Sequence, residues 1–162
     1  MRKLMVVRAV MLAAILAMVL VATGCGSSKN KSAASAKPAL TKAEFLKKGN
    51  AICKRGNQQI NKAARTLFPN KKARPSQAQL KKFATGTLIP SVQRQINGVK
   101  ALGAPKGDEA KVRAIVTSAQ AALDQGKKDP LRLVSKHDPF TKSDKLAKAY
   151  GLTACGSGGG GG

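Results

Sequence analysis

The sequence predicts an all-α protein, a small helical bundle of four main helices plus a short turn, closed by one disulfide. Apolar residues recur at helical spacing in four separate segments of the 162-residue chain. Helix start signals, prolines and glycines separate these segments. No segment shows the alternation of apolar and polar residues that is typical of a β-strand over a useful length.

The first helix is expected to run from Thr41 to about Phe68. Thr41 and Glu44 have the spacing of a capping box, and Pro69 would end the helix. At 100° per residue, one sector of about 120° collects the apolar and small residues: Phe45, Leu46, Gly49, Ile52, Cys53, Gly56, Ile60, Ala63, Ala64 and Leu67. The glycines in this sector would let another backbone approach closely.

The second helix starts with another capping box, Ser76 with Gln79. After Pro90, the apolar positions are rotated by about 100° from those before GTLIP. A proline inside a helix removes a backbone hydrogen bond and clashes with the preceding turn. We therefore expect a kink or break at GTLIP, so that both halves can face the core.

The remaining helices are predicted from caps and stops. Asp108 is the expected N-cap of the third helix, which ends near Gly126. Pro130 would open a short turn of helix. Asp138 is the expected N-cap of the last helix, with Pro139 at its first position, and Gly151 is the expected stop.

The N-terminus has the pattern of a bacterial lipoprotein. Basic residues precede an apolar run from 9 to 22, which as a helix would span roughly 21 Å and is therefore short for a membrane span. Such a run is typical of a signal peptide. Ala22, Thr23, Gly24 and Cys25 then resemble a lipobox, in which the cysteine is diacylated and the chain is cut before it. An uncleaved anchor, or a secreted protein with a stray cysteine, are the alternatives.

These boundaries divide the chain into four parts. Residues 1–24 are the expected lipoprotein signal peptide, 25–40 the lipidated cysteine and a flexible tether, 41–155 the helical domain, and 156–162 a glycine-rich disordered tail. The mature protein would be exported and lipid-anchored to the outer face of the bacterial cell membrane. We expect it to be a monomer.

Lipidation of Cys25 would leave Cys53 and Cys155, and an even pair of cysteines in an exported protein suggests a disulfide. Two free buried thiols, or an intermolecular bond, are the alternatives. Closing a loop of about 100 residues is worth on the order of 4–5 kcal/mol in the chain-entropy estimate.

Two segments, FLKKGNAIC and AYGLTACG, together with the lipobox, resemble small uncharacterised exported lipoproteins of high-GC Gram-positive bacteria. The resemblance covers most of the mature chain but is specific only at these places. It implies the disulfide and a surface location, and it implies no active site.

The charge is strongly unbalanced, with 30 Lys and Arg against 7 Asp and Glu and a net charge of +23. Such a charge attracts polyanions or anionic membranes. One side of the first helix collects basic residues that could bind an anionic envelope polymer or phospholipid: Lys47, Lys48, Lys54, Arg55, Lys62 and Arg65. The alternative is a solvated face without a partner. Sequence-specific binding of nucleic acid is not expected, because aromatic residues for base stacking are scarce.

The sequence offers little for catalysis. Its single histidine, His137, stands beside Asp138 in an expected loop, and neither CxxC, HExxH nor a P-loop occurs. We expect no cofactor, no metal site and no enzymatic activity. The expected function is a membrane-anchored binding or adaptor module of the cell envelope. The alternative is an electrostatic structural protein held by its basic face, and a more remote one is an envelope hydrolase.

Overall fold

The computed structural model describes residues 39–70, 72–135 and 137–157. The predicted signal peptide, the lipobox with Cys25, and residues 25–38 of the predicted tether lie outside these ranges, as do residues 158–162 of the glycine-rich tail. The described residues belong to one compact unit, which includes every residue of the hydrophobic core.

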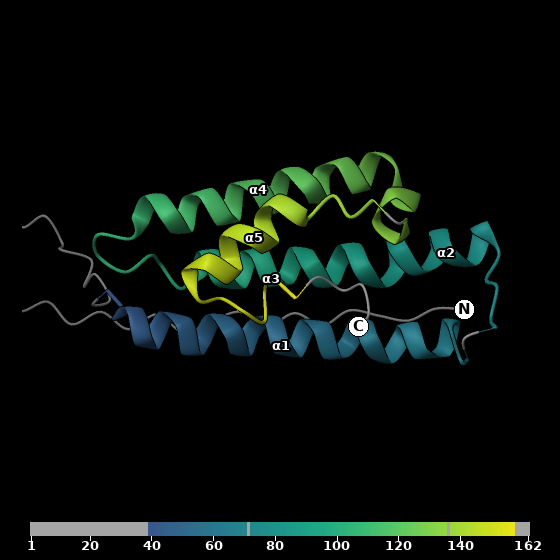
Figure 1. Ribbon diagram of the computed structural model, residues 1–162, viewed down its shortest axis with the longest axis horizontal. Coiled ribbons are helices and arrows are strands. Elements are labelled where there is room, and N and C mark those ends of the chain that lie inside the picture. The colour runs from purple at the N-terminus through teal and green to yellow at the C-terminus, as the bar shows by residue number, and fades with distance from the viewer. Residues whose placement is uncertain (1–38, 71, 136, 158–162) are drawn as a thin grey trace, which may run out of the picture. The chain divides into compact units, whose positions relative to one another are not determined.

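The described chain is helical and contains no strand, as predicted. Its elements are α1 (Lys42–Leu67), α2 (Gln77–Phe83), a π-helical segment (Ala84–Leu88), α3 (Ile89–Ala101), α4 (Glu109–Lys128), a 3-10 helix (Pro130–Val134) and α5 (Thr141–Tyr150). Because α2, the π-helical segment and α3 follow one another without a break, they form one long helix (Figure 1). The four main helices and the short extra turn are therefore confirmed.

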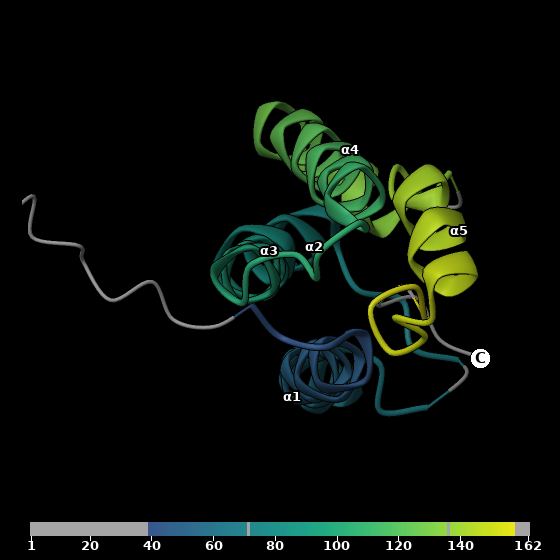
Figure 2. The ribbon, with the colours of Figure 1, turned by 90° about the vertical axis from the view of Figure 1, so that its left-hand side faces the viewer.

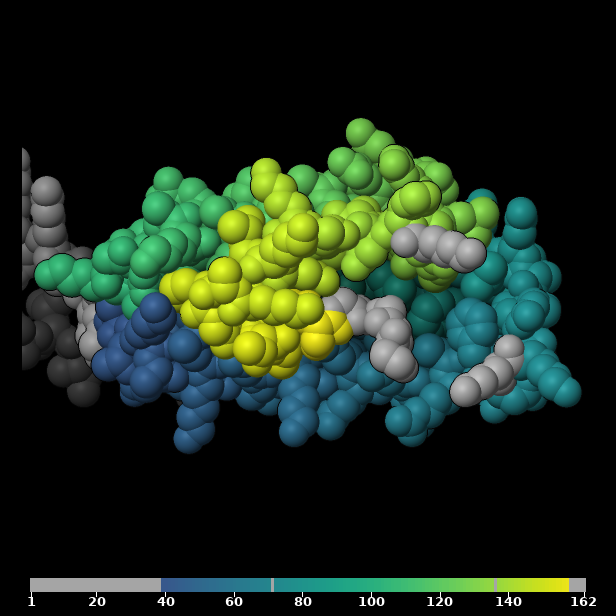
Figure 3. Space-filling model, in the orientation of Figure 1, coloured from purple at the N-terminus to yellow at the C-terminus, as the bar shows by residue number. Residues whose placement is uncertain are grey.

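The helices pack with α3 between α1 and α4, while α5 lies against α4 (Figures 1 and 2). Beyond α5, the chain returns to α1, and together these segments cover the face between α1 and α4 (Figure 3). The core on which they close is formed by Phe45, Cys53, Val99, Val112, Ile115, Ala147, Tyr150 and Leu152. It is mainly aliphatic, with one edge-to-face aromatic pair, Phe45 and Tyr150, whose centroids are 6.1 Å apart.

Helix α1 begins as its sequence predicts. Thr41 accepts a hydrogen bond from the backbone N–H of Glu44, and the Glu44 carboxylate accepts one from the backbone N–H of Thr41 at 2.9 Å. The Thr41 hydroxyl also donates to the Glu44 carboxylate at 2.8 Å, and this hydrogen bond, followed by that from the Thr41 backbone, lowers the pKa of Glu44. The predicted apolar sector faces the core, where five of its residues are buried: Phe45, Gly49, Cys53, Gly56 and Ile60.

Where the sequence predicts a kink or break, the chain forms a π-helical segment, Ala84–Leu88, which ends two residues before Pro90. A π-helical turn holds more residues than an α-helical turn, so it rotates the side chains that follow it. This rotation compensates for the shift of about 100° between the apolar positions before GTLIP and those after Pro90. As a result, Ala84 and Leu88 before the proline and Ile96 and Val99 after it are all buried.

Asp108 is the N-cap residue of α4, as predicted, whereas the predicted N-cap Asp138 is wrong. The Asp108 side chain makes no cap hydrogen bond, since its carboxylate instead accepts from Lys111 Nζ and from the Tyr150 hydroxyl, both at 3.0 Å. Asp138 accepts from the backbone N–H of Phe140 at 2.9 Å in a turn that precedes α5. Because α5 begins only at Thr141, Pro139 lies outside the helix. The predicted stop is confirmed, because Gly151 adopts a left-handed φ of 104°.

The close neighbours of the core glycines are side chains rather than the backbones expected from the sequence. Gly49 contacts Leu152, and Gly56 contacts Gln95. Near the end of α4, Gly126 is buried against Leu133 of the 3-10 helix.

Gly126→Ala should destabilise the protein by about 1–3 kcal/mol, because the new Cβ would overlap three side-chain atoms of Leu133. Gly86→Ala is the matched control, since a Cβ there meets no atom within 4 Å. It should be neutral or stabilising by up to about 1 kcal/mol. Urea unfolding followed by circular dichroism measures both. Equal stability of the two variants would contradict this packing of the 3-10 helix on α4.

Candidate functional site

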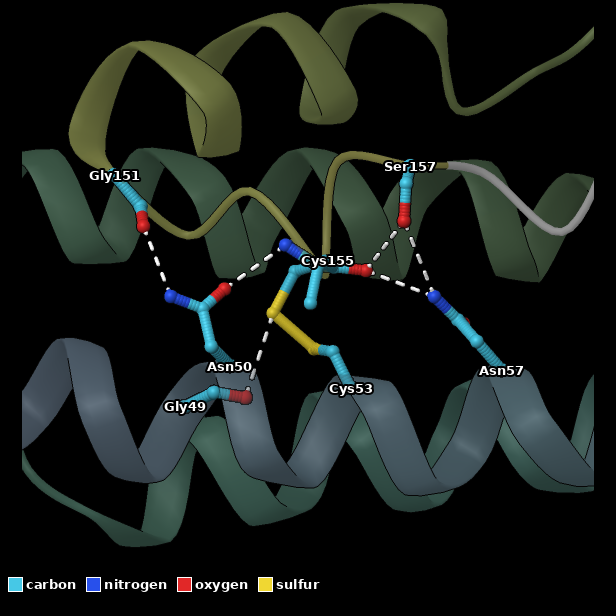
Figure 4. Close-up of a disulfide and its surroundings, with 8 residues drawn as sticks. Gly49, Asn50, Cys53, Asn57, Gly151, Cys155 and Ser157 are labelled. Carbon is cyan, nitrogen blue, oxygen red and sulfur yellow. Dashed lines mark hydrogen bonds between the residues drawn. A yellow bond between two sulfur atoms is a disulfide. The ribbon is translucent and has the colours of Figure 1, made fainter. Parts of the chain in front are cut away.

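The chain after α5 lies along α1 as a strap, which we define as residues 151–157 (Figure 4). Its first anchor is Leu152, which is fully buried. A Cβ at position 49 would come within 2.6 Å of Leu152 Cδ2, so glycine at that position makes room for the leucine. The strap therefore packs into a gap that α1 leaves open.

The second anchor is the disulfide between Cys53 and Cys155, which confirms the predicted pairing. The two residues are 102 positions apart, and their Cα atoms are 5.0 Å apart. In the chain-entropy estimate, a cross-link over so long a loop removes on the order of 4–5 kcal/mol of freedom from the unfolded chain. The sulfur of Cys155 lies 3.7 Å from the carbonyl oxygen of Gly49. Because a disulfide sulfur carries no proton, this approach is a packing contact.

Two asparagines of α1 hold the strap on either side of the disulfide (Figure 4). Asn50 donates to the carbonyl of Gly151 at 3.0 Å and accepts from the backbone N–H of Ala154 at 2.9 Å. Asn57 donates to the carbonyl of Ala154 at 2.8 Å and to the hydroxyl of Ser157 at 3.3 Å. These contacts satisfy strap backbone groups that belong to no regular element.

Sequence reasoning did not single out these asparagines. They are seven positions apart, nearly two helical turns, so they project from α1 in nearly the same direction. Their place at one edge of the apolar sector, three positions before and four after Cys53, is the signal that could have found them. This signal can be recognised only once a strap is known to run beside that edge of the helix.

The predicted basic residues share the side of α1 that faces away from the core, and all six are exposed: Lys47, Lys48, Lys54, Arg55, Lys62 and Arg65. We call this set the basic face. Side chains of α1 project along the lower edge of the molecule in Figure 3. No Asp or Glu occurs in the chain between Glu44 and Asp108, and Glu44, whose carboxylate is held by Thr41, interacts electrostatically with Lys48.

Within the described residues there are three ion pairs, Lys42–Asp108, Lys111–Asp108 and Lys127–Asp124, and none involves the basic face. The six cationic groups therefore lie on one side of α1 without an ion pair to any described residue. Such a surface has a positive potential that a polyanion can reach.

The carboxylate of Asp108 serves the fold. The Asp108 side chain is only 13% exposed, and its Oδ2 lies 3.9 Å from Lys42 Nζ. The hydrogen bond from Lys111, and then that from Tyr150, lower the pKa of Asp108. Burial, followed by the Asp108 carboxylate, raises the pKa of Tyr150 to about 12. This cluster joins the start of α4 to the end of α5.

His137 is exposed, and its backbone N–H donates to Ser135 Oγ at 3.3 Å. The neighbouring Asp138 carboxylate accepts from the Phe140 backbone. In the described part of the chain, no group of three or more His, Cys, Asp or Glu residues is arranged to hold a metal ion. No helix in that part is long and apolar enough to cross a membrane.

Comparison of the chain with protein-family models, with curated proteins and with solved structures gave no match. The basic face, the strap and the interior of the bundle are therefore the features that bear on function.

Replacing both Cys53 and Cys155 by Ser should lower the melting temperature by roughly 10 °C or more, because the unfolded chain regains its freedom. Reactive thiols at Cys53 and Cys155 in the denatured, unreduced protein would contradict the disulfide.

Asn50→Ala should destabilise the protein by about 1–3 kcal/mol, since it leaves two backbone groups of the strap without their partner. Asn61→Ala, at an exposed position on the same helix, is the control and should change the stability little.

Proposed function

We propose that this protein is a non-catalytic binding module of the bacterial cell envelope, anchored by a lipid on Cys25 to the outer face of the membrane. The lipobox-like residues and the apolar run before them support the anchor. The disulfide supports an oxidising location, because such bonds are rare in the cytosol.

The observation that carries the binding role is the basic face, with six exposed cationic side chains and no ion pair to them among the described residues. Its partner carries repeated negative charge, as phosphate groups do in an anionic wall polymer and in phospholipid headgroups. Each Lys or Arg near an anionic membrane surface adds about 1 kcal/mol to binding.

The position of the basic face in the chain fits such a partner. Lys47 and Lys48 lie in the second turn of α1, soon after the predicted tether. A tether of residues 25–40 spans at most roughly 55 Å when fully extended. The anchor would therefore keep α1 within reach of the headgroups and of the polymer close to them, where a high local concentration favours even weak contacts.

The anchor is tested by the mass of the mature protein from a Gram-positive host. We expect residues 25–162 with a diacylglycerol thioether on Cys25, and we expect Cys25→Ser to remain uncut and unmodified. An intact Met1 or an unmodified Cys25 in the wild-type protein would contradict the anchor.

The basic face is tested with residues 37–162, which lack the anchor and hold the whole core. The substitutions Lys47→Gln, Lys54→Gln and Arg65→Gln together should weaken binding to phosphatidylglycerol vesicles by about a hundredfold at low salt. Wild-type binding should weaken steeply as salt is added. A parallel titration with soluble poly(glycerol phosphate) distinguishes the wall polymer from the lipid.

The matched control makes the same change in net charge on α5, with Lys142→Gln, Lys145→Gln and Lys148→Gln, all at exposed positions. This control should weaken binding much less. Equal losses of binding in the two triple variants would assign the binding to net charge rather than to the basic face. If the wild type bound neither the vesicles nor poly(glycerol phosphate), the proposed binding role of the basic face would be wrong.

A further inference from the structure

The bundle has apolar surface that its core does not fill, both inside and outside. Inside, a cavity of about 150 Å³ lies beside the disulfide, and its mainly aliphatic wall includes Cys53, Cys155 and Leu152. Outside, Phe68 at the end of α1 is 45% exposed and is the only exposed large apolar residue in the described chain. The cavity lies within the bundle, whereas Phe68 is open to solvent and to a partner.

Phe68 lies at one end of the bundle, which we call the tip and define as residues 65–70 and 72–83. The end of α1 and helix α2 contact each other there, on the right in Figure 1. Helix α2 has no buried residue. Three further apolar residues of the tip are only half-buried: Leu67, Leu80 and Phe83. Single exposed apolar side chains are common on protein surfaces, so Phe68 is informative only together with its surroundings.

The charged residues of the tip are all basic. No Asp or Glu occurs within it, and its exposed cationic side chains include Arg65, Lys72, Lys81 and Lys82. Arg65 lies one helical turn before Phe68, so the two side chains are neighbours on α1. The 3-10 helix, which packs on α2, begins next to Asp129 and contains Arg132, both exposed, so its own charges balance.

An exposed aromatic ring among cationic side chains matches the chemistry of an anionic lipid surface. Segments that lie at the surface of a membrane place Lys and Arg at the headgroups and Phe, Trp or Leu at the boundary with the acyl chains. A soluble polyanion offers the negative charges but no apolar phase. A membrane is therefore the partner that uses both properties of the tip.

We propose that the tip docks on the anionic phospholipid surface of the membrane, with Phe68 inserted between the headgroups. The inference rests on the proposed function and assigns phospholipid as its partner. Because Arg65 belongs both to the basic face and to the tip, the two surfaces adjoin and contact the same bilayer. The basic face supplies attraction that salt screens, and Phe68 supplies an apolar contact that salt does not screen.

The dimensions of the chain allow this docking. The tip lies at the end of α1 opposite to the predicted tether. Helix α1 has 26 residues and is therefore roughly 39 Å long. A tether of residues 25–40 reaches at most roughly 55 Å when extended. An anchor on Cys25 therefore leaves the tip within reach of the same membrane.

Insertion is tested with tryptophan fluorescence, because the chain contains no tryptophan of its own. Phe68→Trp in residues 37–162 places a single indole at the tip. Its emission should move to shorter wavelength when phosphatidylglycerol vesicles are added, since the indole leaves water, and should not move with soluble poly(glycerol phosphate). Ala121→Trp, at an exposed position of α4, is the matched control and should show no shift with either.

The contribution of the ring to binding is tested with Phe68→Ser, which leaves the net charge unchanged. This variant should bind phosphatidylglycerol vesicles about tenfold more weakly than the wild type, because it loses the burial of an aromatic side chain. Its binding to poly(glycerol phosphate) should be unchanged. The ratio of wild-type to variant affinity for vesicles should persist as salt is added. Circular dichroism establishes that the variants are folded.

Three results would overturn the docking of the tip while leaving the role of the basic face intact. The first is vesicle binding by Phe68→Trp without a change in its emission. The second is an equal loss of vesicle and polymer binding in Phe68→Ser. The third is an emission shift that grows with protein concentration in the absence of vesicles, which would assign Phe68 to a contact between two copies of the chain. Wild-type binding to the polymer but not to vesicles would also overturn the proposal and would leave the wall polymer as the partner of the basic face.

Discussion

The covalent bond between Cys53 and Cys155 is the constraint on which the rest of the structure depends. The core is mainly aliphatic and small, and the chain carries a net charge of +23 that opposes compaction. A contribution on the order of 4–5 kcal/mol is a large share of a typical stability of about 5–15 kcal/mol. The bond also fixes the strap, whose buried Leu152 completes the core.

The sequence predicted those parts of the fold that depend on local chemistry. Thr41 with Glu44 and Ser76 with Gln79 form their caps within one turn, so no distant residue decides them. Asp108 is the N-cap residue of α4 as predicted, but its carboxylate accepts from Tyr150, 42 positions away, instead of from the helix N-terminus. Asp138 closes a turn before α5 and does not cap that helix. Asn50 and the cavity escaped prediction because they depend on the path of the strap and on how four helices fit together.

The two sides of α1 have separate tasks. Its inner side holds the disulfide and the glycines that admit Leu152 and Gln95, whereas its outer side holds the basic face. Substitutions on the outer side therefore leave the core contacts in place, so the electrostatic role can be tested without unfolding the protein. Changes on the inner side affect stability and the cavity together, because Cys53, Cys155 and Leu152 all line that cavity.

The 102-residue separation of the bonded cysteines has a consequence for when the protein matures. Cys155 follows all five α-helices in the chain, so the bond cannot close before the whole helical domain has been synthesised. In a reducing cytosol it would not persist. For the exported protein proposed above, the chain would cross the membrane without its strongest restraint, which suits a translocation pore that passes unfolded polypeptide. The finished shape of strap and cavity would then arise only on the far side.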